Sequence, residues 1–257
     1  MTYCIGISLR AGLIMIADTR TNAGIDNISV YRKLHILADS EDRLIVAASA
    51  GNLSVTQSVL GMLHEGLPAI GTEDHPRRIE HMPTMFRAAQ LIGEAVMMAG
   101  NELKPALRMA GVSAGISLLV GGRIGDGPIK LYLVYDAGNF IECQPDSPFL
   151  QIGATQYGKP ILDRAMTYES SLDEAVKVGL LSFDSTIRSD LSVGLPFDLL
   201  AIPADPALPV IRRRIEADDA YFQDLSARWS RLLNESRAAI PDPPFMAALL
   251  GEGDGTV

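Results

Sequence analysis

The chain has 257 residues, of which 47% are hydrophobic and 21% are charged, so it is long enough to bury a full core as one domain or one and a half. Its formal net charge of −9 opposes nucleic-acid binding, which depends on attraction to phosphates. Its cysteines, Cys4 and Cys143, are too few for a disulfide framework and fit a reducing compartment. With no signal-peptide pattern and no apolar run of about 18 residues, we expect a cytoplasmic protein that binds neither nucleic acid nor membranes.

The first fifty or so residues are predicted to be strands. Residues 2–9 alternate between large apolar and small side chains, which is typical of a strand with one small-residue face. Residues 12–18 are short and apolar and follow a glycine-containing turn, so we expect them to return as the second strand of a hairpin. Two further strands are expected at residues 34–38 and 44–49.

A change to helical spacing follows Gly51. Apolar residues there recur at helical intervals, with Ser54 placed to cap a helix and residues 66–68 placed to end it. A second helix is expected at residues 83–99. Two consecutive helices are therefore expected to cover the first strands.

The second half of the chain repeats this order. Ser171 and Glu174 form the sequence pattern of a capping box and predict the start of a helix. The glycine-rich residues 121–127 are interpreted as a hairpin loop and not as a phosphate-binding loop, because no helix follows them. The other expected elements are strands at 115–120, 129–135, 140–143, 197–202 and 210–215 and a short helix at 158–168. This order predicts an α+β fold with two sheets stacked between two helical layers, an αββα sandwich, in a domain of residues 1–215.

Residues 216–257 are expected to form a helical extension with a glycine-rich acidic end. An amphipathic stripe ends before Pro241 and consists of Phe222, Leu225, Trp229, Leu232 and Leu233. Two interpretations stay open. The helix packs back on its own domain, or, as we prefer, it docks on a neighbouring subunit.

Thr2 directly follows the initiator methionine. If Met1 is removed, Thr2 carries a hydroxyl and a free α-amino group, which supply a nucleophile and its own general base. The ordinary pKa of an α-amine, about 7.7 to 8.0, lies near neutral pH, and a neighbouring cation such as Lys33 lowers it further. Asp18 is placed to pair with Lys33, and Arg20 to anchor that acid. Taken singly, each of these three charged residues is better explained as a solvated turn residue.

The arrangement of these residues, however, resembles a known family. Thr2 is followed by a first hairpin, by residues 17–24 (ADTRTNAG), by Lys33, and by residues 48–51 (ASAG) leading into a helix. This pattern resembles the catalytic β subunits of the proteasome and of the related two-component bacterial protease. It is most similar to the bacterial proteasome-like Anbu peptidases, the ancestral β-subunit family. The resemblance extends over about residues 2–215 and implies an N-terminal-nucleophile (Ntn) hydrolase fold, with an Anbu-type extension at the end of the chain.

The resemblance implies a role for each matching residue. Thr2 is the nucleophile, Asp18 and Lys33 are its electrostatic partners, and the Gly51 amide is the oxyanion donor. The oxyanion role also follows from the position of Gly51 between a strand and a helix, because N–H groups at a helix start stabilise negative charge. The resemblance further implies that Asp190 lies next to the Thr2 amine and that Asn22, Ser49 and Leu53 lie near the substrate.

Two positions depart from the proteasome pattern. Ala154 stands where a serine is expected, and so does Val193, with Ser192 one place early. The hydrogen-bonded surroundings of the amine are therefore altered, or rebuilt from Ser192 or Thr155. We expect activity that is slow, or restricted to unusual peptides or amides.

No metal or organic cofactor is expected. The histidines His35, His64, His75 and His81 have no metal-ligand spacing. Cys4 lies inside a predicted strand with no histidine near it in the sequence, and it is interpreted as a small core residue and not as a nucleophile.

The leading hypothesis is a threonine peptidase that acts on peptides or proteins by acyl transfer, inside a homo-oligomeric ring or spiral that encloses its active sites, as the resemblance implies. One alternative is an amidase or transferase of the same fold acting on a small peptide-like metabolite. Another is an assembly subunit that has kept the fold and lost the chemistry, against which the presence of Thr2, Asp18 and Lys33 argues. The sequence contains no docking motif for an ATPase, so an adaptor or ATPase partner stays an open question.

Overall fold

The computed structural model describes residues 2–22, 28–71 and 75–249. Contacts divide the chain into two units, Met1–Ala217 and Asp218–Val257. The first unit contains two five-stranded antiparallel sheets, with the strand orders β10-β1-β2-β11-β12 and β5-β6-β7-β8-β9. The strands of the first sheet are β1 (Tyr3–Leu9), β2 (Gly12–Asp18), β10 (Phe149–Gly153), β11 (Phe197–Pro203) and β12 (Ile211–Ile215). Those of the second are β5 (Leu34–Ser40), β6 (Arg43–Gly51), β7 (Ile116–Ile124), β8 (Lys130–Val134) and β9 (Phe140–Glu142).

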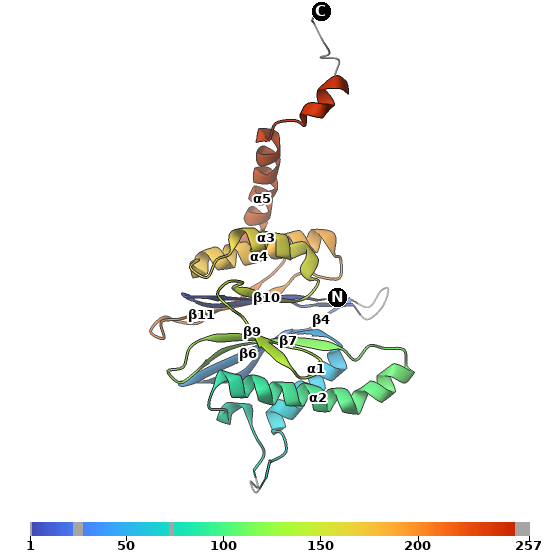
Figure 1. The fold of residues 1–257 in the computed structure, drawn as a ribbon, viewed down its shortest axis with the longest axis vertical. Coiled ribbons are helices and arrows are strands. Elements are labelled where there is room, and N and C mark those ends of the chain that lie inside the picture. The colour runs from blue at the N-terminus through green and yellow to red at the C-terminus, as the bar shows by residue number, and fades with distance from the viewer. Residues whose placement is uncertain (1, 23–27, 72–74, 250–257) are drawn as a thin grey trace, which may run out of the picture. The chain divides into compact units, whose positions relative to one another are not determined.

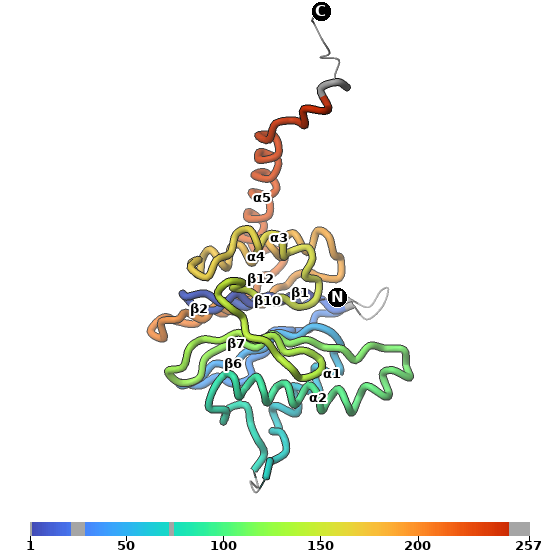
Figure 2. The backbone as a smooth tube through the Cα atoms, viewed as in Figure 1, coloured from blue at the N-terminus to red at the C-terminus, as the bar shows by residue number. Residues whose placement is uncertain are grey.

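Helices cover the outer face of each sheet (Figure 1). Helices α1 (Leu53–Glu65) and α2 (Met85–Met109), with the short 3-10 turn η1 (Ile79–His81) before α2, lie on the second sheet. Helices α3 (Thr155–Ala165) and α4 (Leu172–Ser189) lie on the first. The backbone trace in Figure 2 shows β1 and β2 in a layer that faces β6 and β7. The predicted αββα sandwich is therefore confirmed.

The two faces of β1 explain why small and large side chains alternate along it. Cys4 lies in the core between the sheets, and Gly6 leaves room there for Leu131, since a Cβ on Gly6 would lie 2.7 Å from Leu131 Cδ1. On the other face Ile5 packs against α4, where a Cβ on Gly179 would lie 3.2 Å from Ile5 Cδ1. The strand that follows Thr2 is thus held by packing on both sides.

The start of α1 differs from the prediction. Its N-cap is Asn52, whose side-chain oxygen accepts the backbone N–H groups of Ser54 at 3.0 Å and Val55 at 3.2 Å. Ser54 was therefore wrongly predicted as the cap. In contrast, the predicted capping box of Ser171 and Glu174 at the start of α4 is confirmed.

Residues 121 and 122 lie inside β7 and do not form the predicted loop. The turn comes later, at residues 125–127. A Cβ on Gly121 would lie 2.6 Å from Leu13 Cδ2, so the missing side chain lets the two sheets approach each other. Strand β10 and a separate two-stranded ribbon of β3 (Arg20–Asn22) and β4 (Ile28–Val30) were not predicted, and α2 continues past residue 99 to Met109.

The second unit contains α5 (Ala220–Ala239) and the 3-10 helix η2 (Pro244–Leu249). Ion pairs one helical turn apart join Arg228 to Asp224 and Arg231 to Glu235 on α5. Across residues 2–22, 28–71 and 75–249, no helix is both long enough and apolar enough to cross a membrane.

Candidate active site

Asp18 and Lys33 form a buried ion pair at the end of β2. Lys33 Nζ donates to Asp18 Oδ1 at 2.7 Å and to the backbone carbonyl of Arg20 at 2.6 Å. Asp18 is the last residue of β2 and its side chain is fully buried, while 7% of the Lys33 side chain is exposed. The structure thus brings together the two residues that were predicted to pair.

The charge on Asp18 depends on its partners. Burial raises the pKa of the Asp18 carboxyl above its ordinary value, because a carboxylate loses its hydration inside the protein. The Lys33 ammonium opposes this rise, and so does the backbone N–H of Tyr3, which donates to Asp18 Oδ1 at 3.0 Å. A buried charge is tolerated when it is paired and hydrogen-bonded in this way.

Arg20 does not anchor Asp18, so that prediction was wrong. Its guanidinium donates to the Leu191 carbonyl at 2.9 Å. The expected alternation does not continue from Asp18 to Arg20, because β2 ends at Asp18 and Arg20 begins β3 in a separate ribbon. What Arg20 contributes to the ion pair is its backbone carbonyl, which accepts from Lys33.

The main chain holds Thr2 in place. The Ala154 N–H donates to the Thr2 carbonyl at 2.7 Å. Gly153 approaches this carbonyl with φ of +85°, and any Cβ there would collide with it, so only glycine fits. The Thr2 residue is 9% exposed, and Met1 lies outside the described residues. The position of Thr2 is therefore fixed by backbone contacts that no side-chain motif reveals.

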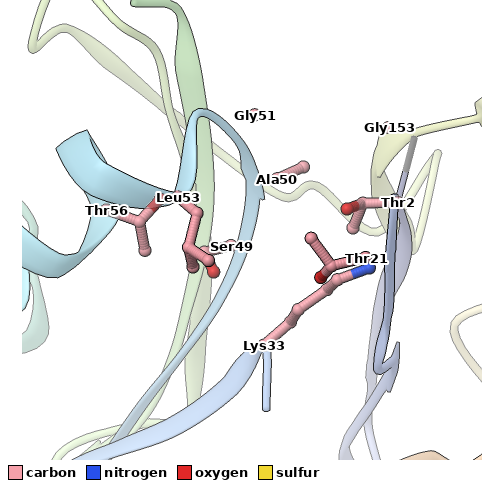
Figure 3. A pocket seen from close by; sticks show the side chains of 9 residues that line it. All are labelled: Thr2, Thr21, Lys33, Ser49, Ala50, Gly51, Leu53, Thr56 and Gly153. Carbon is pink, nitrogen blue, oxygen red and sulfur yellow. The ribbon is translucent and has the colours of Figure 1, made fainter. Parts of the chain in front are cut away.

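Thr2 and Lys33 line the same cavity, which has a volume of about 280 Å³ (Figure 3). Figure 3 shows the Lys33 side chain extending across it toward Thr2. Ser49 and Leu53, expected near the substrate, also line it, as does Gly51. The other lining residues are Thr21, Ala50, Thr56 and Gly153.

Thr21 and Thr56 were not singled out from the sequence. Thr21 lies within the matched segment of residues 17–24, which was the available signal. Thr56 lies in the first turn of α1, where its hydroxyl donates to the Asn52 carbonyl at 3.0 Å. The position of Thr56 in the cavity wall could be recognised only once the start of α1 was known.

The backbone direction at Gly51 leaves its N–H open. The neighbouring Asn52 N–H donates to the Gly115 carbonyl at 3.1 Å, and bonded and non-bonded pairs alternate along an antiparallel ladder. Gly51, paired with Ile116, therefore belongs to a non-bonded pair, and its N–H points away from β7. On that side β5 begins only at Leu34, opposite Ala48. The Gly51 N–H thus points to the β5 side of β6, past the first residue of β5, as the Ser49 N–H two residues earlier does when it donates to the Lys33 carbonyl at 3.0 Å.

Asp190 and Ser192 form a tight turn after α4. Asp190 Oδ1 accepts from the Ser192 N–H at 2.9 Å and from the Ser192 hydroxyl at 2.5 Å. Asp190 Oδ2 is buried and has no hydrogen-bond partner within the described parts of the chain. Val193 and Ala154 are each 1% exposed and offer no hydroxyl there. Ser192 therefore orients Asp190, and one carboxylate oxygen is left over.

The remaining predictions concern Asn22, Cys4 and metal binding. Asn22 ends β3, and its side chain lies outside the described part of the structure. Cys4 lies behind Ser49, to whose carbonyl its Sγ donates at 3.7 Å, and burial raises the pKa of the thiol so that it stays protonated. Among the described residues, no group of three or more His, Cys, Asp and Glu side chains is placed to hold a metal ion.

Two stacked antiparallel sheets between helical layers, with Thr2 before the first strand and a buried Asp18–Lys33 pair beside it, define a protein of the proteasome β-subunit class with an Ntn-hydrolase fold. Three solved structures make the family explicit. Anbu from Hyphomicrobium sp. strain MC1 is 41% identical with a TM-score of 0.83, and the match covers 94% of this chain and 99% of that one. Anbu (ancestral β-subunit) from Yersinia bercovieri is 37% identical with a TM-score of 0.83, and the match covers 94% of this chain and 98% of that one. The protein in the helical assembly of the Anbu complex from Pseudomonas aeruginosa is 40% identical with a TM-score of 0.85, and the match covers 94% of this chain and 98% of that one.

The chain therefore belongs to the Anbu family of proteasome β-like proteins. No protein-family model and no curated protein matches it.

Proposed function

We propose that this protein is a threonine-type Ntn peptidase that hydrolyses peptide or amide bonds through Thr2 after removal of Met1. The observation that carries the proposal is that Thr2, Lys33 and Gly51 line one cavity. This cavity has room for a substrate side chain beside the hydroxyl of Thr2.

In the proposed reaction the Thr2 hydroxyl attacks the substrate carbonyl while the freed α-amine takes its proton. The Gly51 N–H, which points away from β7, stabilises the negative charge that forms on the carbonyl oxygen. The amine then gives the proton to the departing nitrogen, which leaves an ester on Thr2. Water activated by the same amine hydrolyses this ester and restores the hydroxyl.

The surrounding charges support these steps. Lys33 holds a positive charge beside the reacting atoms, and Asp18 holds Lys33 in position through the 2.7 Å contact. Asp190 Oδ2, which has no hydrogen-bond partner among the described residues, supports a role for Asp190 and Ser192 in binding the freed amine, because an amine or ammonium would supply that hydrogen bond. This arrangement replaces the serines expected at positions 154 and 193.

We also propose that the protein acts as a homo-oligomer, with the hydrolase in residues 1–215 and an assembly function in residues 216–257. The Pseudomonas aeruginosa relative is a helical assembly and is 40% identical to this chain. The side chains of Tyr221, Leu232 and Leu233 on α5 are exposed, which supports docking of this helix on a neighbouring subunit.

Labelling with a peptide epoxyketone tests the peptidase proposal. This reagent forms a ring with an N-terminal threonine, because the hydroxyl adds to the ketone and the free α-amine opens the epoxide. We expect intact-mass analysis of the full chain to show loss of Met1 and gain of one probe on Thr2, and the Thr2→Ala variant to gain none. A chain that keeps Met1, or a processed chain that does not react, would refute the proposal and favour the silent assembly subunit.

A further inference from the structure

A histidine lies behind one wall of the cavity beside Thr2. Ser49 lines the cavity, and its Oγ lies 3.2 Å from His35 Nε2. His35 lies on β5 directly opposite Ala47, two residues before Ser49 on β6, so the three side chains share one face of the sheet. His35 is not among the lining residues and thus acts on the cavity only through Ser49.

The protonation state of the His35 imidazole suits a hydrogen bond with the Ser49 hydroxyl. Burial lowers the pKa of His35, so the ring is neutral near neutral pH. A neutral imidazole carries one donor and one acceptor nitrogen, and either tautomer can therefore bond a hydroxyl. Ser49 is 6% exposed, and without His35 its hydroxyl would need another partner.

The charges around the cavity restrict what it can bind. Lys33 is the charged side chain among the lining residues, and its ammonium is already paired with Asp18. No carboxylate lines the cavity among the described residues. A cationic substrate side chain would therefore enter next to a cation and find no partner.

We propose that His35 is a specificity-determining residue, which keeps the Ser49 hydroxyl hydrogen-bonded and so lets the cavity accept uncharged apolar substrate side chains. The proposal rests on the proposed function, in which this cavity receives the side chain next to the cleaved bond. A site rejects an apolar group strongly only when the group leaves a buried polar atom unpaired. Because His35 already satisfies Ser49, leucine and the similarly sized asparagine are both accepted, whereas lysine is excluded.

Binding to a protein that cannot react tests this inference apart from the chemistry. In full-length Thr2→Ala protein, calorimetry would compare acetylated tripeptide amides that end in leucine, asparagine or lysine. We expect His35→Leu to weaken binding of the leucine peptide relative to the asparagine peptide by about threefold to tenfold, the effect of about one hydrogen bond. His35→Gln supplies a new partner for Ser49 and is expected to keep the original ratio.

A double variant completes the test. Ser49→Ala removes the hydroxyl itself, so adding it to His35→Leu is expected to restore leucine binding. The inference would be overturned if His35→Leu left the ratio of leucine-peptide to asparagine-peptide affinity unchanged. It would also be overturned if the Thr2→Ala protein bound the lysine peptide more tightly than the leucine peptide, or bound none of the three peptides. If the ratio shifts while Thr2 does not react with the epoxyketone, the specificity role stands and the peptidase proposal falls. If Thr2 reacts and the ratio does not shift, the reverse holds.

Discussion

Single residues in this site stabilise one another in pairs, and Asp18 and Lys33 show this most clearly. Asp18→Asn leaves a buried ammonium without its anion, and Lys33→Met leaves a buried carboxylate without its cation. Each change is expected to lower the free energy of unfolding by about 3–5 kcal/mol. The double variant is expected to lose less than the sum of the two, because both charges are then gone.

Urea unfolding at neutral pH measures these differences. The exposed pair Lys159 and Asp163 on α3, one helical turn apart with 53% and 49% of the side chains exposed, is the matched control. Lys159→Met and Asp163→Asn are expected to change stability by less than about 0.5 kcal/mol. Equal losses in the buried and exposed pairs would show that Asp18 and Lys33 are not coupled as described.

The residues of the candidate site were predictable where side chains make the contacts. Asp18 and Lys33 could be named from the spacing of charged residues after Thr2 and from the resemblance to a known family. Contacts made through the backbone could not be predicted, because nearly every residue type supplies an N–H and a carbonyl. The Ala154 N–H that holds Thr2 and the Arg20 carbonyl that holds Lys33 belong to this second kind.

At the scale of elements, the start of α1 links the fold to the cavity and offers a direct test. The Asn52 side chain accepts two N–H groups of α1, and it also donates to the Ser113 carbonyl at 2.8 Å. We expect Asn52→Ala to lower the free energy of unfolding by about 1–2 kcal/mol, the usual effect of losing a cap. Ser54→Ala is expected to cost less than about 0.5 kcal/mol, because the Ser54 hydroxyl only adds a bond to Asn52. Chemical unfolding measures both variants. A larger loss of stability in Ser54→Ala than in Asn52→Ala would show that Ser54, and not Asn52, caps the helix.

Elements were predicted well where one periodicity dominates and poorly where tertiary packing overrides it. The hairpin of β1 and β2 and the capping box of α4 follow local rules, and both are present. Residues 121 and 122 were interpreted as a turn because glycine usually marks one, yet β7 needs a glycine at 121 to pack against Leu13 and another at 122, where a Cβ would collide with the Leu44 carbonyl. Strand β10 is five residues long and pairs with β1 from far along the chain, a contact that local patterns do not encode.

For the whole molecule, the order of elements was enough to predict the layers. Strands followed by two helices, twice over, can bury both sheets only if the sheets face each other and the helices cover their outer faces. The mode of assembly is different, because it depends on surfaces that a partner must match. Exposed apolar side chains on α5 indicate where such a surface lies, and only an experiment on the assembled protein can test it.

The proposed assembly through α5 predicts a charge-sensitive oligomer. Leu233 is 49% exposed, and Leu233→Lys would place a cation in an apolar contact between subunits. Asn234→Lys adds the same charge at the next, polar position of the helix and serves as the control. In sedimentation velocity runs we expect Leu233→Lys to shift the protein toward smaller species at concentrations where wild type and Asn234→Lys stay assembled, with unchanged circular dichroism. If removal of residues 218–257 and Leu233→Lys both leave the sedimentation profile intact, assembly does not use α5 and must form through the sandwich domain alone.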